Sequence, residues 1–205
     1  MQIRAVITDF GGVLYNPPDL SWLRRWQTIL GLKNDDLVNQ MFDPGTGLDL
    51  MQKVFTGEIH EAEVWNRAAA RWRTSPALIR WLQKRGFSRK RFNEPMAAFI
   101  QSLRPAYMTA ILSNAGDQGR QTFCMAYQLE KLVDTVIISA EEGLAKPDER
   151  IYYLALERLG VAVQEALFID DLGVNVEAAR RVGIKSVHFH ETHQAVGEIK
   201  AILVA

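Results

Sequence analysis

The sequence predicts an α/β protein in which a parallel sheet of about five strands is covered by helices on both faces. Short apolar runs alternate with helical patterns through the second half of the chain, which is typical of a parallel sheet with crossover helices. The first run, 3–7, is rich in β-branched residues, as expected of a strand buried on both faces. Residues 16–90 show helical patterns and no convincing strand, which predicts an all-helical insert after the first strand.

Each element of the sheet has its own local signal. The predicted strands, each a short run of apolar or β-branched residues, are 3–7, 107–113, 135–139, 166–171 and 185–189. Helical periodicity, often closed by glycine, predicts helices within 19–31 and over 34–42, 48–55, 58–72, 75–84, 95–103, 117–129, 148–159, 174–182 and the C-terminal segment. The predicted organisation is therefore a core of residues 1–15 and 91–205 and a helical insert of residues 16–90.

Composition narrows the classes of partner. The 205 residues include 24 basic and 24 acidic side chains, so there is no net charge to attract nucleic acid or an anionic membrane. A single cysteine, Cys124, excludes an intrachain disulfide and fits a reducing compartment. The start of the chain lacks the layout of a signal peptide, and no apolar run approaches membrane-spanning length. We therefore expect a cytoplasmic protein, a monomer or small homo-oligomer, with no nucleic acid or membrane partner.

Polar residues follow three of the predicted strands. Because right-handed crossovers place the carboxyl ends of parallel strands at one edge of the sheet, these residues should meet there. Two glycines, Gly11 and Gly12, would let the backbone fold closely around a bound group at that edge. The residues expected at the edge are Asp9, Ser113, Asn114, Asp170, Asp171 and, from the loop after the third strand, Lys146.

The chemistry of these groups indicates phosphoryl transfer. Carboxylates crowded at one edge repel each other unless a cation neutralises them, and oxygen ligands suit magnesium. Lysine supplies a fixed positive charge for a phosphate or a nucleophilic carboxylate. A serine hydroxyl and exposed backbone amides suit phosphate oxygens. A carboxylate nucleophile, a hard metal and an anion site together make a phosphoryl-transfer centre.

Four segments in this order resemble the motifs of the haloacid dehalogenase superfamily, and most closely its phosphatases with a small helical cap. The resemblance covers nearly the whole chain and implies a Rossmann-like core, with residues 16–90 as the cap. The segments that carry it are Ile7–Leu14, Ile111–Asn114, Lys146–Asp148 with the helix through Tyr152, and Phe168–Asn175.

The resemblance implies catalytic and substrate-binding roles for the matching residues. Asp9 would attack phosphorus and form an aspartyl-phosphate. Lys146 would neutralise charge between Asp9 and the phosphoryl group. Ser113 and the backbone amide of Asn114 would hold phosphate oxygens. The implied substrate is a small phosphate monoester, such as a sugar phosphate.

Magnesium is the cofactor that the resemblance implies. Its ligands would be the Asp9 carboxylate, the backbone carbonyl of Gly11 and Asp171. Asp170 would sit beside the metal or bind it through water, and Asn175 would hold a metal-bound water.

One position departs from the family pattern. Phosphatases of this family commonly carry a second Asp two residues after the nucleophile, as general acid and base, and Gly11 occupies that position here. General acid–base catalysis is typically worth about 10²–10⁴ in rate. The 2-haloacid dehalogenases of the family also lack that Asp and need no magnesium, so a dehalogenase using Asp9 is the alternative. The pair Asp170–Asp171 favours the phosphatase, and a non-catalytic or weakly catalytic binding protein on the same fold stays a third possibility.

Two histidines, His188 and His190, flank Phe189 at the end of the last predicted strand. A metal site there is conceivable, but the spacing is more typical of surface residues, which is our expectation.

Overall fold

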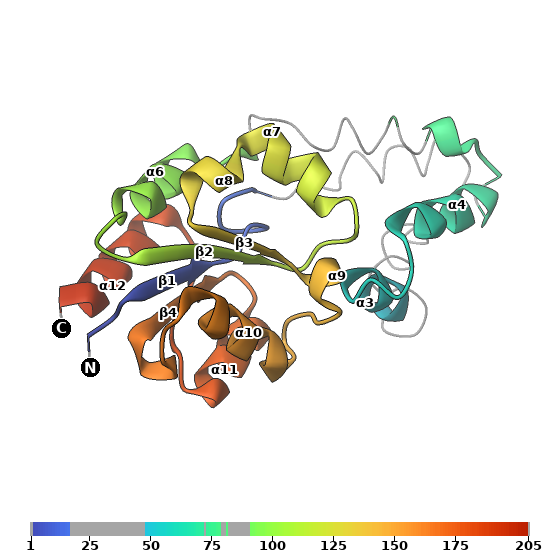
Figure 1. The fold of residues 1–205 in the computed structure, drawn as a ribbon. Helices are drawn as coiled ribbons and strands as arrows, with labels where there is room; N and C mark the ends of the chain where they lie inside the picture. The colour runs from blue at the N-terminus through green and yellow to red at the C-terminus, as the bar shows by residue number, and fades with distance from the viewer. Residues whose placement is uncertain (1, 17–47, 72, 79–80, 82–90, 205) are drawn as a thin grey trace.

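The computed structural model describes residues 2–16, 48–71, 73–78, 81 and 91–204. Its centre is a five-stranded parallel sheet with strand order β3-β2-β1-β4-β5 (Figure 1). The strands are β1 (Ala5–Thr8), β2 (Met108–Ser113), β3 (Thr135–Ile138), β4 (Ala166–Asp170) and β5 (Lys185–His188). The predicted fold class and strand number are thus confirmed. The central position of β1 places the residue after it, Asp9, between the ends of β2 and β4.

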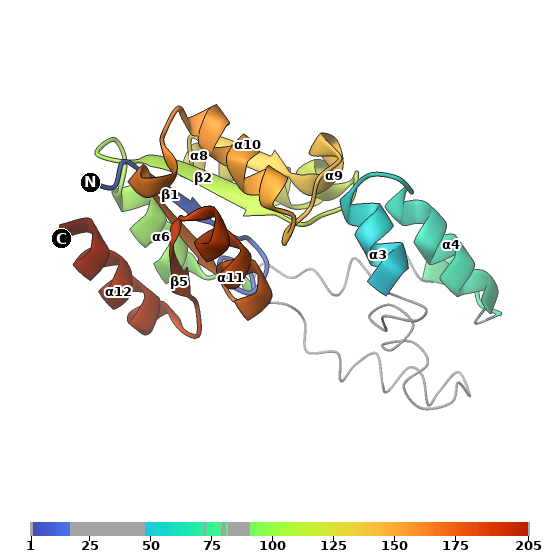
Figure 2. The ribbon, with the colours of Figure 1, turned by 90° about the horizontal axis from the view of Figure 1, so that it is seen from below.

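Helices cover both faces of this sheet (Figures 1 and 2). On one face lie α6 (Glu94–Ser102), α8 (Leu129–Leu132) and α12 (Thr192–Val204), whose buried side chains share a core cluster with Val6, Ile111 and Leu167. On the other face, α10 (Glu149–Leu159) and α11 (Gly173–Val182) pack with Ile7, Leu112 and Phe168. Successive strand residues therefore alternate between two apolar layers, as a doubly covered sheet requires.

Two predicted boundaries are wrong. A single helix over 117–129 is replaced by a π-helical turn (Arg120–Cys124), α7 (Met125–Tyr127) and α8, because Gln128 adopts a left-handed conformation with a φ of 53°. The break turns the chain so that Leu129 and Leu132 are buried. Ser139 does not end the third strand but begins α9 (Ser139–Glu142).

The described part of the insert consists mainly of α3 (Leu48–Phe55) and α4 (Glu61–Arg71), which lie beyond the carboxyl edge of the sheet, with α3 the nearer of the two to α9 (Figures 1 and 2). The turn between them approaches the core closely. A Cβ on Gly57, whose φ is 71°, would lie 2.5 Å from the carbonyl oxygen of Ala140. The helices expected within 19–31 and 34–42 fall outside the described residues, as does most of the one expected over 75–84. The domain boundaries themselves stay a prediction.

The two ends of the insert meet at the core. Tyr15 and Phe92 form an antiparallel bridge. The amide of Asn16 donates to the Arg91 carbonyl at 2.9 Å, and the amide of Asn93 donates to the Leu14 carbonyl at 2.8 Å. The chain therefore leaves and re-enters the core at one place, directly beyond the Asp9 segment. Among the described residues, no helix is long and apolar enough to cross a membrane.

Candidate active site

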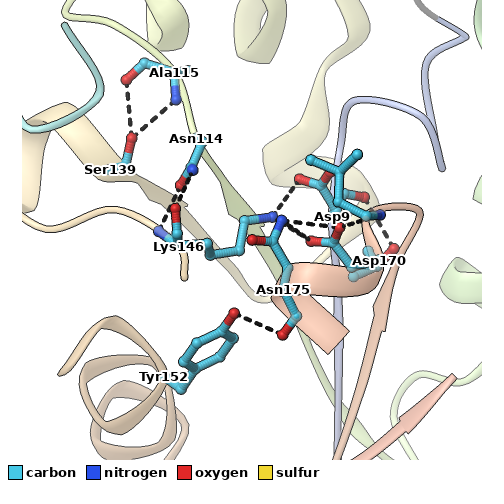
Figure 3. A network of polar contacts seen from close by, with 10 residues as sticks. Asp9, Asn114, Ala115, Ser139, Lys146, Tyr152, Asp170 and Asn175 are labelled. Carbon is cyan, nitrogen blue, oxygen red and sulfur yellow. Dashed lines mark hydrogen bonds and ion pairs between the residues drawn. The ribbon is translucent and has the colours of Figure 1, made fainter. Parts of the chain in front are cut away.

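The charged residues predicted at the carboxyl edge of the sheet are brought together there (Figure 3). Lys146 Nζ lies 2.8 Å from Asp9 Oδ1 and 2.7 Å from Asp170 Oδ2. Asp9 follows β1, Asp170 ends β4, and Lys146 comes from the loop between α9 and α10. Three segments distant in sequence thus place one ammonium group between two carboxylates.

Lys146 is 2 % exposed, so its ammonium group has lost almost all contact with bulk water. Burial alone would lower its pKa, but the charges of Asp9 and Asp170 outweigh burial and raise the Lys146 pKa above its ordinary value. Lys146 therefore stays protonated and acts as a fixed cation, not as a base.

Asp170 is fully buried, and its carboxylate accepts hydrogen bonds from three residues. Oδ1 accepts from the amide of Leu172 at 2.9 Å, Oδ2 accepts from Lys146, and Asn175 Nδ2 lies 3.1 Å from both oxygens. Buried charges persist only when paired and hydrogen-bonded in this way. Asp170 thus holds Lys146 in place, and the amide of Asn175 fixes the orientation of Asp170.

Asp9 and Asp171 are the more accessible carboxylates. Burial raises the pKa of Asp9 to about 7; the charge of Lys146 opposes this shift and that of Asp170 adds to it. Burial also raises the pKa of Asp171, again with a contribution from Asp170. Both carboxyls thus prefer a proton, or another cation, over carrying a bare negative charge.

The donor set fits a hard divalent cation. Asp9, Asp170 and Asp171 each offer one oxygen within 4.8 Å of the others. A Cβ on Gly12 would lie 2.1 Å from the Asp171 carboxylate, so this glycine is needed for Asp171 to turn toward the cluster. An all-oxygen set of this kind suits magnesium better than zinc or copper. Gly11, whose carbonyl is a predicted ligand, lies in the exposed turn directly after Asp9.

The predicted anion site lies at the end of β2. Ser113 is 4 % exposed, yet its hydroxyl makes no hydrogen bond to any residue that the structure describes. A buried hydroxyl without a partner costs stability unless a ligand or water satisfies it. Ser113 is therefore free to donate to a phosphate oxygen. The neighbouring Asn114 turns its side chain elsewhere, toward the backbone of Lys146.

Some residues that contact the site were missed or misjudged from the sequence. His188, expected at the surface, is half-buried, and its Nε2 lies 2.9 Å from the carbonyl oxygen of Asp171. The Tyr152 hydroxyl donates to the carbonyl of Asn175 at 2.9 Å. Ser139, taken as a strand residue, is fully buried and bonds the backbone of Ala115. The contact of His188 could have been predicted from its position at the end of β5, because that strand ends at the same edge of the sheet as Asp171.

A doubly wound sheet with a carboxylate–lysine centre at its carboxyl edge places these charged groups where α/β proteins of this architecture bind their ligands. The chain belongs to the haloacid dehalogenase-like hydrolases, because the sequence model of that family matches residues 3–183.

Three relatives illustrate the range of this family. The chain is 29% identical over 206 residues to acyl-CoA dehydrogenase family member 10 of Mus musculus, covering 98% of this chain and 19% of that protein. Sesquiterpene phosphatase astK of Aspergillus oryzae is 30% identical over 128 residues, 54% of this chain and 65% of that one. (S)-2-haloacid dehalogenase 4A of Burkholderia cepacia is 32% identical over 95 residues, 46% and 41% respectively. The chain thus spans less than two thirds of the length of each relative.

Solved structures share this fold. A HAD-like hydrolase of Porphyromonas gingivalis superimposes with a TM-score of 0.79 at 24% identity, covering 100% of both chains. A HAD-family enzyme of Bacteroides thetaiotaomicron, solved in complex with magnesium and inorganic phosphate, gives a TM-score of 0.74 at 20% identity, covering 94% of this chain and 98% of that one.

Proposed function

We propose that this hydrolase is a magnesium-dependent phosphatase of a small phosphate monoester, such as a sugar phosphate. The observation that carries the proposal is the convergence of Asp9, Asp170 and Asp171, whose carboxylate oxygens lie within 4.8 Å of one another, with the Lys146 ammonium paired to the first two. Three carboxylates exceed the single lysine in charge, so a further cation is required before a dianionic phosphate can bind there. A phosphatase named among the relatives and a magnesium–phosphate complex among the related structures support the same function.

Asp9 is the nucleophile in this proposal. One of its carboxylate oxygens attacks phosphorus, the bond between phosphorus and the leaving oxygen breaks, and that oxygen takes a proton from water. Water then attacks the phosphorus of the aspartyl-phosphate, loses a proton, and releases inorganic phosphate while the Asp9 carboxylate is restored. Gly11 supplies no proton in either step.

Other residues bind and orient the phosphoryl group. The Lys146 ammonium, 2.8 Å from Asp9, orients the nucleophile and balances the negative charge that arrives with the substrate. Ser113 Oγ and the backbone amide of Asn114 donate to phosphate oxygens. Asp9, Asp171 and the carbonyl of Gly11 would hold magnesium. Asp170 would lie beside the metal or bind it through water, and Asn175 would hold a metal-bound water. When bound, magnesium neutralises charge between the carboxylates and the phosphoryl oxygens.

A 2-haloacid dehalogenase that uses Asp9 as nucleophile is the second candidate. Gly11 favours it, since halide leaves without a proton, and one relative carries that activity in its name. The carboxylate cluster weighs against it, because an unneutralised set of three acids repels an anionic haloacid.

Hydrolysis rates measured on a panel of small phosphate esters and 2-haloacids, with magnesium and with chelator, distinguish the two. Phosphate release that chelator stops and added magnesium restores is the expected result. Release of halide from a haloacid in chelator, without phosphate release, would overturn the proposal in favour of the dehalogenase. Turnover of neither substrate class would support the binding-protein alternative.

A further inference from the structure

The side chain of Asn114 is directed at the backbone of Lys146, not at the cluster of carboxylates (Figure 3). Its Nδ2 donates to the Lys146 carbonyl at 2.8 Å, and its Oδ1 accepts from the Lys146 amide at 2.9 Å. Asn114 thus pairs with both backbone groups of a residue 32 positions later in the chain. These two bonds engage its oxygen and its nitrogen together, and the backbone pattern of Lys146 fixes which is which.

The contact with Asn114 restrains the backbone from which the Lys146 side chain extends. The ammonium group of lysine lies at the end of a flexible four-carbon stem, so its position depends on how firmly the Cα is held. At the outer end, Asp9 and Asp170 hold Nζ at 2.8 and 2.7 Å. At the inner end, Asn114 holds the backbone. The side chain is therefore fixed at both of its ends.

The residue that holds Lys146 is itself held. Ala115, next to Asn114, donates its amide to Ser139 Oγ at 3.0 Å, and Ser139 Oγ lies 3.2 Å from the Ala115 carbonyl. Ser139 is fully buried at the start of α9. The loop after β2 is thus fastened to the segment after β3 by two pairs of hydrogen bonds, one on each side of the peptide between Asn114 and Ala115.

We propose that Asn114 is a positioning residue that holds Lys146 through its backbone and thereby sets the place of the ammonium group. This role goes beyond the phosphate contact of the Asn114 amide, because it belongs to the side chain. Its effect on turnover rests on the proposed phosphatase function, but the placement of Lys146 does not.

Chemical labelling of the Lys146 amine tests the placement without any turnover. In the wild-type protein, acetylation of Lys146 by an N-hydroxysuccinimide ester should be slow, because the amine is buried between two carboxylates. Asn114→Ala removes two hydrogen bonds of ordinary strength, so labelling of Lys146, followed by mass spectrometry, should rise roughly tenfold. Labelling equal to that of the wild type would overturn the proposal.

Asn93→Ala is the matched control. Asn93 is also a half-buried asparagine whose amide joins distant parts of the core, through the Val13 carbonyl and the Thr192 hydroxyl at 2.9 Å each. It makes no bond to Lys146 that the structure describes. Its loss should leave Lys146 labelling unchanged. An equal rise in both variants would mean general loosening of the core and would contradict a specific role for Asn114.

Two further variants sharpen the test. Asn114→Asp keeps an acceptor for the Lys146 amide but turns an oxygen toward the Lys146 carbonyl, so labelling should also rise; full protection would contradict the paired contact.

In an active enzyme, Asn114→Ala should lower kcat more than it changes KM, and should have no further effect in a Lys146→Met background. An undiminished effect in that background would overturn the role through Lys146. If the wild type hydrolyses no phosphate ester, the proposed function fails while the labelling result still decides the placement.

Discussion

Asp9 is paired with the Lys146 ammonium at 2.8 Å, and the Asp170 carboxylate contacts the same ammonium at 2.7 Å. Burial raises the pKa of Asp9 to about 7 even though the charge of Lys146 acts in the opposite direction. A nucleophile that is ionised only with help from neighbouring cations remains weakly solvated and hence reactive. In the proposed phosphatase, the reactivity of Asp9 thus depends on its partners as much as on its own side chain.

Asp9→Asn is expected to abolish turnover, because an amide cannot attack phosphorus and form the aspartyl-phosphate. The loss of rate should be at least about 1,000-fold. The folded state should persist, since asparagine has nearly the same volume, and circular dichroism with thermal unfolding checks this. A well-folded Asp9→Asn protein with substantial steady-state hydrolysis would contradict the assignment of the nucleophile.

In the proposed phosphatase, the residue at position 11 would decide how the leaving group gains its proton. With no acid at this position, rates should depend steeply on leaving-group acidity, so p-nitrophenyl phosphate should be hydrolysed much faster than alkyl phosphates. Gly11 has no positive φ, and a Cβ there would meet no atom within 4 Å, so an aspartate is sterically accommodated. Gly11→Asp should therefore speed alkyl esters by about 10–100-fold and aryl esters less.

Single-turnover rates on both ester types provide the measurement. If the wild type cleaves alkyl and aryl phosphates at equal chemical-step rates, and Gly11→Asp folds but changes neither, then another group already supplies the proton.

At the scale of elements, the turn from α3 to α4 is fastened to the core by one carboxylate. Asp117 Oδ1 accepts from the amide of Glu61, the first residue of α4, at 3.0 Å, and Asp117 Oδ2 lies 3.0 Å from His60 Nδ1. Hydrogen bonds from these groups lower the pKa of Asp117, so it stays ionised at neutral pH. The start of α4 is therefore capped by a residue of the core.

Asp117→Ala is expected to loosen this start at a cost of about 1 kcal/mol, the usual value of a helix cap. Amide hydrogen exchange over the first turn of α4 should accelerate, while exchange in β1 and β4 should not change. Asp148→Ala is the control, since Asp148 caps α10 within the core through the Arg150 amide and should affect α10 alone. Unchanged exchange at α4 in the Asp117 variant would show that the cap contributes nothing there.

The elements differ in how far the sequence predicts them. The strands are predicted to within one or two residues, because runs such as Val6–Ile7 and Phe168–Ile169 are apolar on both faces. The helix expected over 117–129 fails because no local signal marks Gln128 for a left-handed conformation. Its break is decided by the burial of Leu129 and Leu132, which is a tertiary effect.

Some contacts of the candidate site can also be predicted from the sequence, and others cannot. Asp9, Lys146 and Asp170 are predicted to meet because the edge of a parallel sheet collects strand ends. The pairing of Asn114 with the Lys146 backbone is not predictable in this way, since it depends on a side-chain orientation across 32 residues. The contact between His188 and the Asp171 carbonyl is likewise set by the register of β4 against β5.

At the scale of the whole molecule, stability should depend on pH through Asp9. Its folded-state pKa of about 7 lies above the ordinary 3.8, so the stability it contributes is present at low pH and is lost as pH rises through about 7. In the proposed site, magnesium would replace the proton as the neutralising charge. The rise in Tm on adding magnesium should therefore be larger at pH 8 than at pH 5.

Differential scanning calorimetry at the two pH values makes the comparison, with Asp9→Asn as the control in which the difference should shrink. An equal magnesium-induced shift at both pH values would contradict a cation site built on Asp9.

The bridge between Tyr15 and Phe92 has a consequence for how such a chain can change over time. The segment between Asn16 and Arg91 begins and ends at neighbouring points of the core. If it were removed, a short turn could join the two chain ends, and if it were exchanged, a different segment could start and end at the same points. Doubling the length of a loop with fixed ends adds only about 0.6 kcal/mol of closure entropy. The architecture thus offers one insertion point a few residues after Asp9, where a different segment could be introduced while the carboxylate–lysine cluster at the edge of the sheet is kept.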